Sequence, residues 1–387
     1  FNWRGIDGTE ILTHFPPENT YNSELDTEFL LPAQKGFKEK DRLNEFISLF
    51  GVGDGGGGPK PENIELGRRM SNLENSPRVQ FDTAKNFFNR LDKHKGDLET
   101  WVGELYLELH RGTLTTHGLV KKQNRKLEWK LRSVEMLFSC LSVEDYPIEK
   151  LDRLWKILLI NQFHDIIPGS SINLVYQTTH TEYEQIQKGC DQLMNESAKK
   201  LFKQDSESFV LLNTLSYSWK GSVKIPESFE NHHILNEDGN EIPLQRTEEG
   251  VFALVELSSL SFTTFKKGDS VVQNLEKDDN LSLENKLIRY EFDENGALIS
   301  AYDKELEKEF MAGLGNVLSL YEDRPNNWDA WDVDFFYREA LIETAEITHA
   351  SSHSKGGVLQ QLKFEFKIGN SSIQQLVSLN PLSKRLD

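Results

Sequence analysis

Between residues 77 and 205, hydrophobic residues recur at the three- and four-residue spacing of a helix face that packs against other helices. This spacing predicts helices over residues 83–94, 113–140, 148–166 and 181–202. The third of these segments places the following residues on one side: Leu151, Leu154, Trp155, Leu158 and Leu159. Long helices joined by short connections predict a helical bundle.

From about residue 207 the pattern changes to the alternation typical of half-buried strands. We expect strands at residues 209–213, 223–225, 251–255, 287–292 and 359–368. A hairpin-type turn is expected at residues 293–297, which read Asp-Glu-Asn-Gly-Ala. The pattern predicts an all-β domain, and a β-sandwich fits it best.

The first part of the chain has a mixed α/β pattern. A short strand is expected at residues 11–15, ended by two prolines, and a helix at residues 37–48. A second strand is expected to run into the glycine-rich stretch after residue 49. The predicted domains are therefore residues 1–76 (α/β), 77–205 (helical) and 206–387 (β).

Composition narrows the possible functions. The chain has 387 residues and a net charge of −18, which argues against a nucleic-acid partner because phosphate binding needs a basic surface. No apolar run approaches the length of a membrane span. Two cysteines allow no disulfide framework, so we expect a cytoplasmic protein. Because the chain starts at Phe1, with no Met and no signal peptide, and stops at Asp387 soon after a strand-like stretch, we expect an internal piece of a longer protein.

The glycine-rich stretch at residues 51–59 reads Gly-Val-Gly-Asp-Gly-Gly-Gly-Gly-Pro. It lacks the Gly-Lys-Ser/Thr of a phosphate-binding P-loop. Pro59 and Pro61 argue against a dinucleotide-binding helix that opens at the last glycine. The alternatives are a flexible linker and an active-site loop that carries Asp54, and we favour the loop because glycines let backbone approach a ligand closely.

The most distinctive motif lies at residues 161–172, Asn-Gln-Phe-His-Asp-Ile-Ile-Pro-Gly-Ser-Ser-Ile. It places His164 and Asp165 at the end of an apolar helix pattern that Pro168 and Gly169 stop. An imidazole is a common transition-metal ligand, and a neighbouring carboxylate can bind a metal or sugar hydroxyls. When a His-Asp dipeptide is the sole motif in a sequence, it more often has only a structural role, in which the histidine suits the negative end of the helix dipole.

In the segment at residues 103–113, polar and apolar residues alternate only partly, and His110-Arg111-Gly112 interrupts this alternation. Either it is an extended connector with a charged, solvated face, or it presents Glu108, His110 and Arg111 to a site. These residues alone leave both interpretations open.

A loop rich in Pro and Asn contains Trp328, Asp329, Trp331 and Asp332. Aromatic rings stack on the C–H face of a sugar and carboxylates accept its hydroxyls, so this composition suits a carbohydrate site. Alternatively, the tryptophans attach the loop to a neighbouring domain.

Four segments in this order resemble the α-mannosidases of glycoside hydrolase family 38, of the cytosolic and bacterial type. They are residues 51–59, 103–113, 161–172 and 328–334, and residues 1–9 are a weaker match. The resemblance covers essentially the whole chain. It implies the C-terminal part of a seven-stranded β/α barrel, then a helical bundle, then a β-sandwich domain that is truncated here.

The resemblance also implies the chemistry of a retaining mannosidase that acts on mannose-containing oligosaccharides. In the family a zinc ion is held by four ligands, of which His164 would be one, while Asp165 would contact substrate hydroxyls or groups around the metal. Asp54 lies about where the acid/base belongs. A His-x-Asp zinc motif and the nucleophile's segment are absent from the sequence, so we expect the 387 residues alone to be inactive and metal-free.

Two other functions remain open. The chain could belong to a non-catalytic carbohydrate-binding or interaction protein of the same architecture, or to a different metal hydrolase such as a metallophosphatase. The scattered histidines have no HExxH or paired spacing, which argues against the latter. We expect no membrane partner, and self-association of the enzyme is an expectation without a specific motif.

Overall fold

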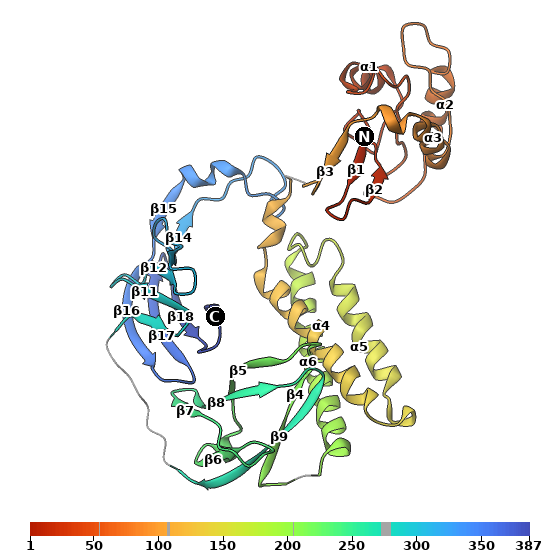
Figure 1. Ribbon diagram of the computed structural model, residues 1–387. Coiled ribbons are helices and arrows are strands. Elements are labelled where there is room, and N and C mark those ends of the chain that lie inside the picture. The colour runs from red at the N-terminus through yellow and green to blue at the C-terminus, as the bar shows by residue number, and fades with distance from the viewer. Residues whose placement is uncertain (54, 107–108, 204, 272–279) are drawn as a thin grey trace. The chain divides into compact units, whose positions relative to one another are not determined.

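A computed structural model describes residues 1–53, 55–106, 109–203, 205–271 and 280–387 (Figure 1). The chain forms two compact units, Phe1–Glu108 and Leu109–Asp387, and each is described by itself below. Both contain helices and small sheets, so the chain has a mixed α and β fold. Among the described residues, no helix has both the length and the apolar character that crossing a bilayer requires.

The first unit contains a small sheet with the order β2-β1-β3. Its central strand β1 (Asn2–Arg4) pairs antiparallel with β2 (Glu10–Leu12) and parallel with β3 (Thr100–Val102). A parallel pair needs a long crossover, and the helices of this connection supply it. They are α1 (Thr27–Gly36), α2 (Pro61–Arg69), α3 (Ala84–Leu91) and a 3₁₀ turn at Asp92–Asp97.

Two predictions for the first unit were wrong. Residues 37–48 form turns and irregular backbone, and the helix lies just before them, where Asp26 caps α1 by accepting from the backbone of Glu28 and Phe29. Phe37 and Leu43 are buried in the core of this unit, so their spacing reflects core contacts without a helix. The strand expected at Leu49 and Phe50 is also absent, since both residues have irregular backbone, and α2 begins at Pro61, where proline suits the first helical position.

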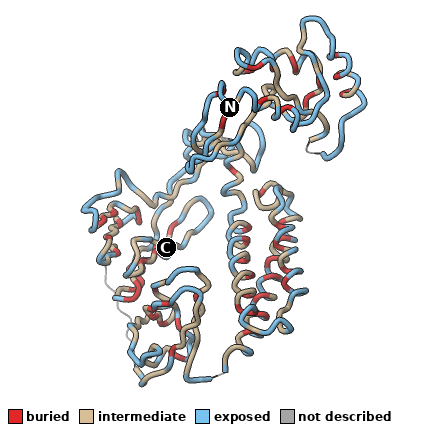
Figure 2. The backbone as a smooth tube through the Cα atoms, turned by 45° about the vertical axis from the view of Figure 1, so that its right-hand side comes forward, coloured by how far each residue is buried: buried red, intermediate tan, exposed pale blue. Residues whose placement is uncertain are grey.

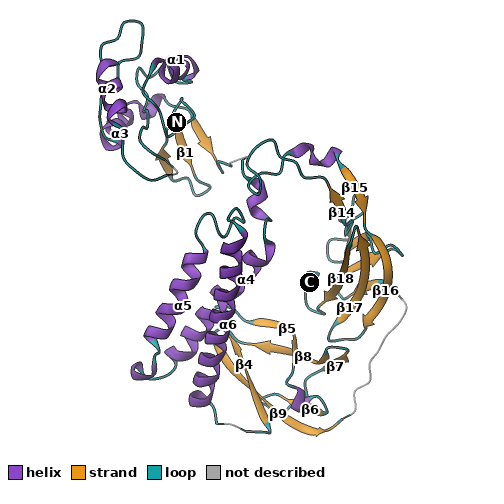
Figure 3. Cartoon of the chain, turned by 180° about the vertical axis from the view of Figure 1, so that it is seen from behind, coloured by secondary structure: helices purple, strands orange, loops and turns teal. Residues whose placement is uncertain are grey.

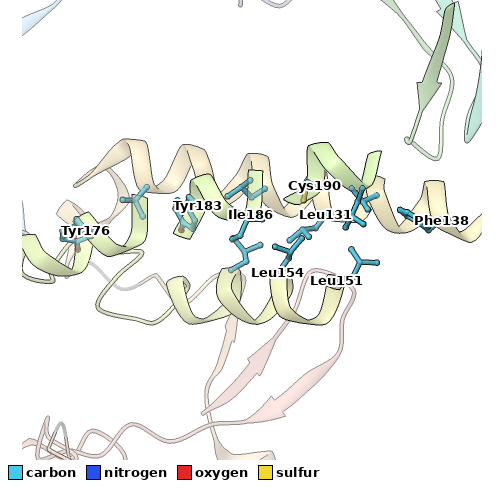
Figure 4. Close-up of a cluster of buried hydrophobic side chains, with 13 residues drawn as sticks. Leu131, Phe138, Leu151, Leu154, Tyr176, Tyr183, Ile186 and Cys190 are labelled. Atoms are coloured by element: carbon cyan, nitrogen blue, oxygen red, sulfur yellow. The ribbon is translucent and has the colours of Figure 1, made fainter. Parts of the chain in front are cut away.

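Three long helices open the second unit: α4 (Gly118–Ser139), α5 (Ile148–Asn161) and α6 (Asn173–Leu201). Their facing sides share one buried cluster (Figure 4), which includes Val120, Leu127, Leu131, Val134, Phe138, Leu151, Leu154, Leu158, Tyr183 and Ile186. Buried positions follow the facing sides of these helices in Figure 2. The three- and four-residue spacing of apolar positions therefore identified the right helix faces.

The helix bounds differ from the predictions in informative ways. α5 ends at Asn161 and not at residue 166, because the backbone turns before Pro168. α6 begins at Asn173 and not at residue 181, and its added turns bury Tyr176. Leu159 was assigned to the buried face of α5 but is 56% exposed.

The strands of the second unit form small sheets, shown in orange in Figure 3. Their orders are β4-β9-β6, β5-β8-β7, β10-β11-β12-β13, β14-β15 and β16-β17-β18. The strands are β4 (Ser208–Asn213), β5 (Trp219–Lys224), β6 (His232–Leu235), β7 (Leu244–Thr247), β8 (Gly250–Leu257), β9 (Ser261–Ser270), β10 (Ser282–Glu284), β11 (Ile288–Phe292), β12 (Leu298–Asp303), β13 (Lys308–Glu309), β14 (Ser319–Tyr321), β15 (Leu341–Thr344), β16 (Glu346–Ser354), β17 (Gln360–Ile368) and β18 (Ser371–Leu379). Their pairings are antiparallel.

Alternation located these strands well. In β8 the alternate residues Val251, Ala253, Val255 and Leu257 are buried, as expected of a strand with one face toward a core. The predicted strand at residues 359–368 is β17, and the predicted turn at residues 293–297 joins β11 to β12. Separate buried clusters lie under β4–β9 and under β10–β18.

Candidate functional site

His164 and Asp165 lie in the turn that follows α5. Their side chains are 78% and 50% exposed, and Nε2 of His164 lies 3.9 Å from Oδ2 of Asp165. The ring of Phe163 lies against the His164 ring, with centroids 4.1 Å apart. The turn therefore presents an imidazole and a carboxylate together at an accessible surface.

Hydrogen bonds to the backbone of Asp165 fix this turn. Its carbonyl accepts from the hydroxyl of Ser171 at 2.5 Å, from that of Ser170 at 3.3 Å and from that of Tyr176 at 3.4 Å. The Tyr176 hydroxyl also accepts from the backbone N–H of Ser171 at 2.9 Å. Because these bonds use the main chain, they hold the turn without involving the carboxylate.

The start of α4 packs against the same turn. Gly169 has φ +100, and a Cβ there would come within 2.6 Å of Cγ2 of Thr116. Beside it, the ring of His117 stacks on that of Tyr176, with centroids 3.9 Å apart and planes inclined by 19°. The segment that begins at His110 is thus in direct contact with the His164-Asp165 turn.

His110 belongs to that segment and also meets the tryptophan loop. Its backbone N–H donates to Oδ1 of Asp332 at 2.5 Å, and its Nδ1 lies 3.2 Å from the same oxygen. The backbone N–H of Thr113 donates to the carbonyl of Trp331 at 3.2 Å. Gly112 allows this approach, since a Cβ would lie 2.9 Å from the Trp331 carbonyl oxygen.

The tryptophan loop is a tight turn that exposes one ring. The backbone N–H groups of Trp331 and Asp332 both donate to the Trp328 carbonyl at 2.9 Å. Trp328 has φ 61 and is 64% exposed, with its ring edge-on to His110 at 6.2 Å. Trp331 lies closer to His110, at 5.0 Å. An exposed indole beside polar groups can stack on a sugar ring.

The side chains of this loop differ in accessibility. Asp332 is 14% exposed and engaged with His110, so it holds the loop in place. Asp329 and Arg111 are exposed. The structure thus joins three of the four sequence motifs, because the segment at residues 109–117 contacts both the His164-Asp165 turn and the tryptophan loop.

Three protein-family models match successive parts of the chain. Residues 1–104 match the glycosyl hydrolases family 38 N-terminal domain, residues 108–201 the alpha mannosidase middle domain, and residues 283–387 the glycosyl hydrolases family 38 C-terminal domain. The chain belongs to glycosyl hydrolase family 38. The sequence-based resemblance is confirmed.

Family 38 relatives match along nearly the whole chain. The chain is 34% identical over 399 residues to mouse alpha-mannosidase 2C1, which covers 98% of this chain and 37% of the relative. It is 32% identical over 436 residues to alpha-mannosidase G of Dictyostelium discoideum, covering 100% of this chain and 40% of the relative. The chain therefore spans well under half the length of these relatives.

A solved alpha-mannosidase structure has a similar fold. The alpha-mannosidase from Enterococcus faecalis V583 superimposes with a TM-score of 0.65 at 16% identity, over 100% of this chain and 55% of that one. At this identity the likeness concerns the fold alone.

Family 38 implies a bound metal ion. The side chains around His164 show whether enough ligands are present to hold it. A zinc site needs three or four protein ligands. Across the described ranges, no group of three or more His, Cys, Asp and Glu side chains is placed to hold a metal ion. His164 and Asp165 supply one imidazole and one carboxylate, so the residues at the turn do not by themselves make up a zinc site.

Two of the predicted site residues, Asp54 and Glu108, lie outside the described residues. Thr116, His117 and Tyr176 were not predicted. Tyr176 was missed because α6 was expected to begin later, whereas Pro168-Gly169 correctly indicated the turn that Tyr176 closes.

Proposed function

We propose that the gene product containing this chain is a retaining α-mannosidase that releases terminal α-linked mannose from oligosaccharides. The observation that carries the proposal is the contact of the segment at residues 109–117 with both the His164-Asp165 turn and the tryptophan loop. An accessible imidazole and carboxylate occur there together with an exposed indole, which are the side-chain types that bind a sugar.

In this proposal each group has a role. Asp165 and Asp329 accept sugar hydroxyl protons, and Trp328 stacks on the C–H face of the ring. His110 and Arg111 line the substrate side, with Trp331 and Asp332 supporting them. Glu108, which lies outside the described residues, stays a candidate substrate-binding residue on the basis of the sequence.

The proposed chemistry is a double displacement with retention. One carboxylate attacks the anomeric carbon while a second carboxyl group protonates the leaving oxygen, and water, deprotonated by that second group, then hydrolyses the glycosyl-enzyme ester to release mannose. Such enzymes hold the two carboxyl groups about 5–5.5 Å apart. Asp54 remains the candidate acid/base, and the nucleophile is expected among residues other than those of this sequence. We propose zinc as the metal and His164 as one of its ligands.

We also propose a three-part domain architecture. It comprises a β/α-barrel part at residues 1–76, a helical bundle at 77–205 and a β-sandwich at 206–387. A cytoplasmic location is supported by Cys140 and Cys190, both of which are free thiols.

The test is an assay of the intact gene product on a chromogenic aryl α-mannoside, with metal content measured in parallel. His164→Ala is expected to lower kcat/KM by about a hundredfold or more, because it removes a side chain that the proposal makes a ligand of the metal. His180→Ala is the matched control, since His180 lies on α6 and contacts Gln123. A metal-free wild-type protein that hydrolyses no α-mannoside but binds mannose oligosaccharides in calorimetry would favour the non-catalytic carbohydrate-binding protein.

A further inference from the structure

Lys121, in the first turns of α4, makes a set of contacts that no motif predicted. Its Nζ donates to three backbone carbonyls: Thr116 at 2.5 Å, Ile167 at 2.8 Å and Pro168 at 3.2 Å. A lysine ammonium has three N–H donors, so this geometry satisfies all of them with main-chain oxygens. Burial lowers the pKa of Lys121, which agrees with an ammonium partly withdrawn from water.

The three carbonyls belong to two segments that meet at this point. Ile167 and Pro168 follow the His164-Asp165 pair in the turn after α5. Their carbonyls accept charge-assisted hydrogen bonds from the ammonium, which are stronger than bonds from a neutral donor. Lys121 supplies that ammonium from a neighbouring helix, and so fixes the position of the turn relative to α4.

Thr116 extends this connection toward the tryptophan loop. Its backbone N–H and its hydroxyl lie 2.9 and 2.8 Å from the Gly112 carbonyl oxygen, and the hydroxyl also lies 3.1 Å from the Ala330 carbonyl oxygen. The residue that receives the shortest Lys121 bond is therefore also in contact with the loop that carries Trp328. The Lys121 ammonium therefore lies where the His164-Asp165 turn meets the segment that contacts the tryptophan loop. These are the two halves of the proposed sugar site.

We propose that Lys121 is a positioning residue of the mannoside site, which holds the His164-Asp165 turn against Thr116 and so sets how that turn and the tryptophan loop face a sugar together. This inference rests on the proposed function. Ser171 and Tyr176 bond to the Asp165 carbonyl of the same turn. The turn is thus held both by Lys121 and by these hydroxyls, while the His164 and Asp165 side chains stay accessible.

The test compares Lys121→Met with Lys122→Met in the intact gene product. Methionine keeps the unbranched apolar stem of the side chain and removes the three donors, and Lys122 is an exposed neighbour on the same helix. The direct readout is amide hydrogen exchange at Ile166, Ile167 and Gly169, whose N–H groups bond within the turn. Loss of charge-assisted bonds is expected to speed exchange there by about ten- to a hundredfold, with the core amides of α4–α6 unchanged.

Kinetics on an aryl α-mannoside separate positioning from a purely structural role. Lys121→Met is expected to raise KM about tenfold, because the turn no longer presents its side chains in one place, whereas a smaller folded fraction would lower kcat and leave KM unchanged. Lys121→Arg, which keeps a cation and its donors, is expected to restore most of the loss.

Three results would overturn the proposal. One is turn exchange in Lys121→Met equal to that in Lys122→Met. Another is faster exchange throughout α4–α6, which would make Lys121 a structural residue of the helices. The third is faster turn exchange with an unchanged KM. A wild-type protein that hydrolyses no α-mannoside would instead overturn the proposed function, and the exchange comparison would still decide whether Lys121 holds the turn.

Discussion

Asp332 accepts a hydrogen bond from the backbone N–H of His110 at 2.5 Å, although 222 positions separate the two residues in the chain. His110 adopts the left-handed conformation, with φ 61 and ψ 39, just before a short 3₁₀ helix at Arg111–Leu114. For a residue other than glycine this conformation costs roughly 1–2 kcal/mol. The carboxylate of Asp332 stabilises this conformation by accepting a hydrogen bond from the backbone N–H of His110.

Removing this carboxylate should loosen the tryptophan loop. Asp332→Ala is expected to lower the free energy of unfolding by about 1–3 kcal/mol, because a partly buried N–H loses its acceptor. Urea unfolding measures the loss, and limited proteolysis between residues 322 and 340 locates it. Asp329→Ala is the control, since Asp329 is exposed in the same loop. Equal losses in the two variants would contradict the role assigned to Asp332.

Gly112 should tolerate no side chain. A Cβ at this position would lie 2.9 Å from the Trp331 carbonyl oxygen and 3.0 Å from its carbon, both of which are backbone atoms. Gly112→Ala is therefore expected to cost about 1–3 kcal/mol and to speed amide exchange at Thr113, which donates to that carbonyl. The matched control is Gly118→Ala, where a Cβ meets nothing within 4 Å. Unchanged exchange at Thr113 would mean that the loop moves aside at little cost.

Much of the architecture could be predicted from local patterns. The buried faces of α4–α6 follow the helical period, β8 follows strict alternation and β17 alternates from Leu362 to Phe366, because each of these elements packs one face on a core. The motifs at His164-Asp165 and Trp328–Asp332 were found because their residue types are unusual in ordinary turns. Membership of family 38 followed from the order of these motifs along the chain.

Contacts between distant segments could not be predicted in this way. Nothing near His110 in sequence indicates Asp332, and nothing near Lys121 indicates the carbonyls of Ile167 and Pro168. Such bonds depend on where two segments meet after folding. The same limit explains the helix wrongly expected at residues 37–48, since Phe37 is buried by tertiary packing on an irregular backbone.

Leu158 and Leu159 are adjacent in α5 and offer a paired test of the helix face. Leu158 is fully buried in the cluster shared by α4, α5 and α6, whereas Leu159 is 56% exposed. Leu158→Ala is expected to lower the free energy of unfolding by about 2–5 kcal/mol through the cavity that it leaves. Leu159→Ala should change it by less than about 0.5 kcal/mol. Urea unfolding followed by circular dichroism near 222 nm, the usual helix signal, measures both, and a large loss in Leu159→Ala would indicate that this face packs against another surface.

His14 should make the first unit sensitive to mild acid. Its ring lies between Phe37 and Phe87, with centroids 5.9 and 5.0 Å away, and its Nε2 accepts from the backbone N–H of Ile47 at 3.4 Å. Burial lowers the pKa of His14 from 6.5 to about 4. The unfolded chain therefore takes up a proton between these two pH values while the folded unit does not.

This difference in bound protons sets the direction in which the stability of the first unit changes with pH. Stability of the first unit is expected to be full above pH 6.5 and to fall as the pH drops from 6.5 toward about 4. Amide exchange in α3, measured at several pH values and corrected for intrinsic rates, reports this unit within the whole chain. His14→Gln keeps an acceptor without the titration, so its profile should be flatter across this window. His94→Gln, at an exposed histidine of the same unit, should retain the wild-type slope, and a wild-type slope in His14→Gln would show that other groups cause the acid sensitivity.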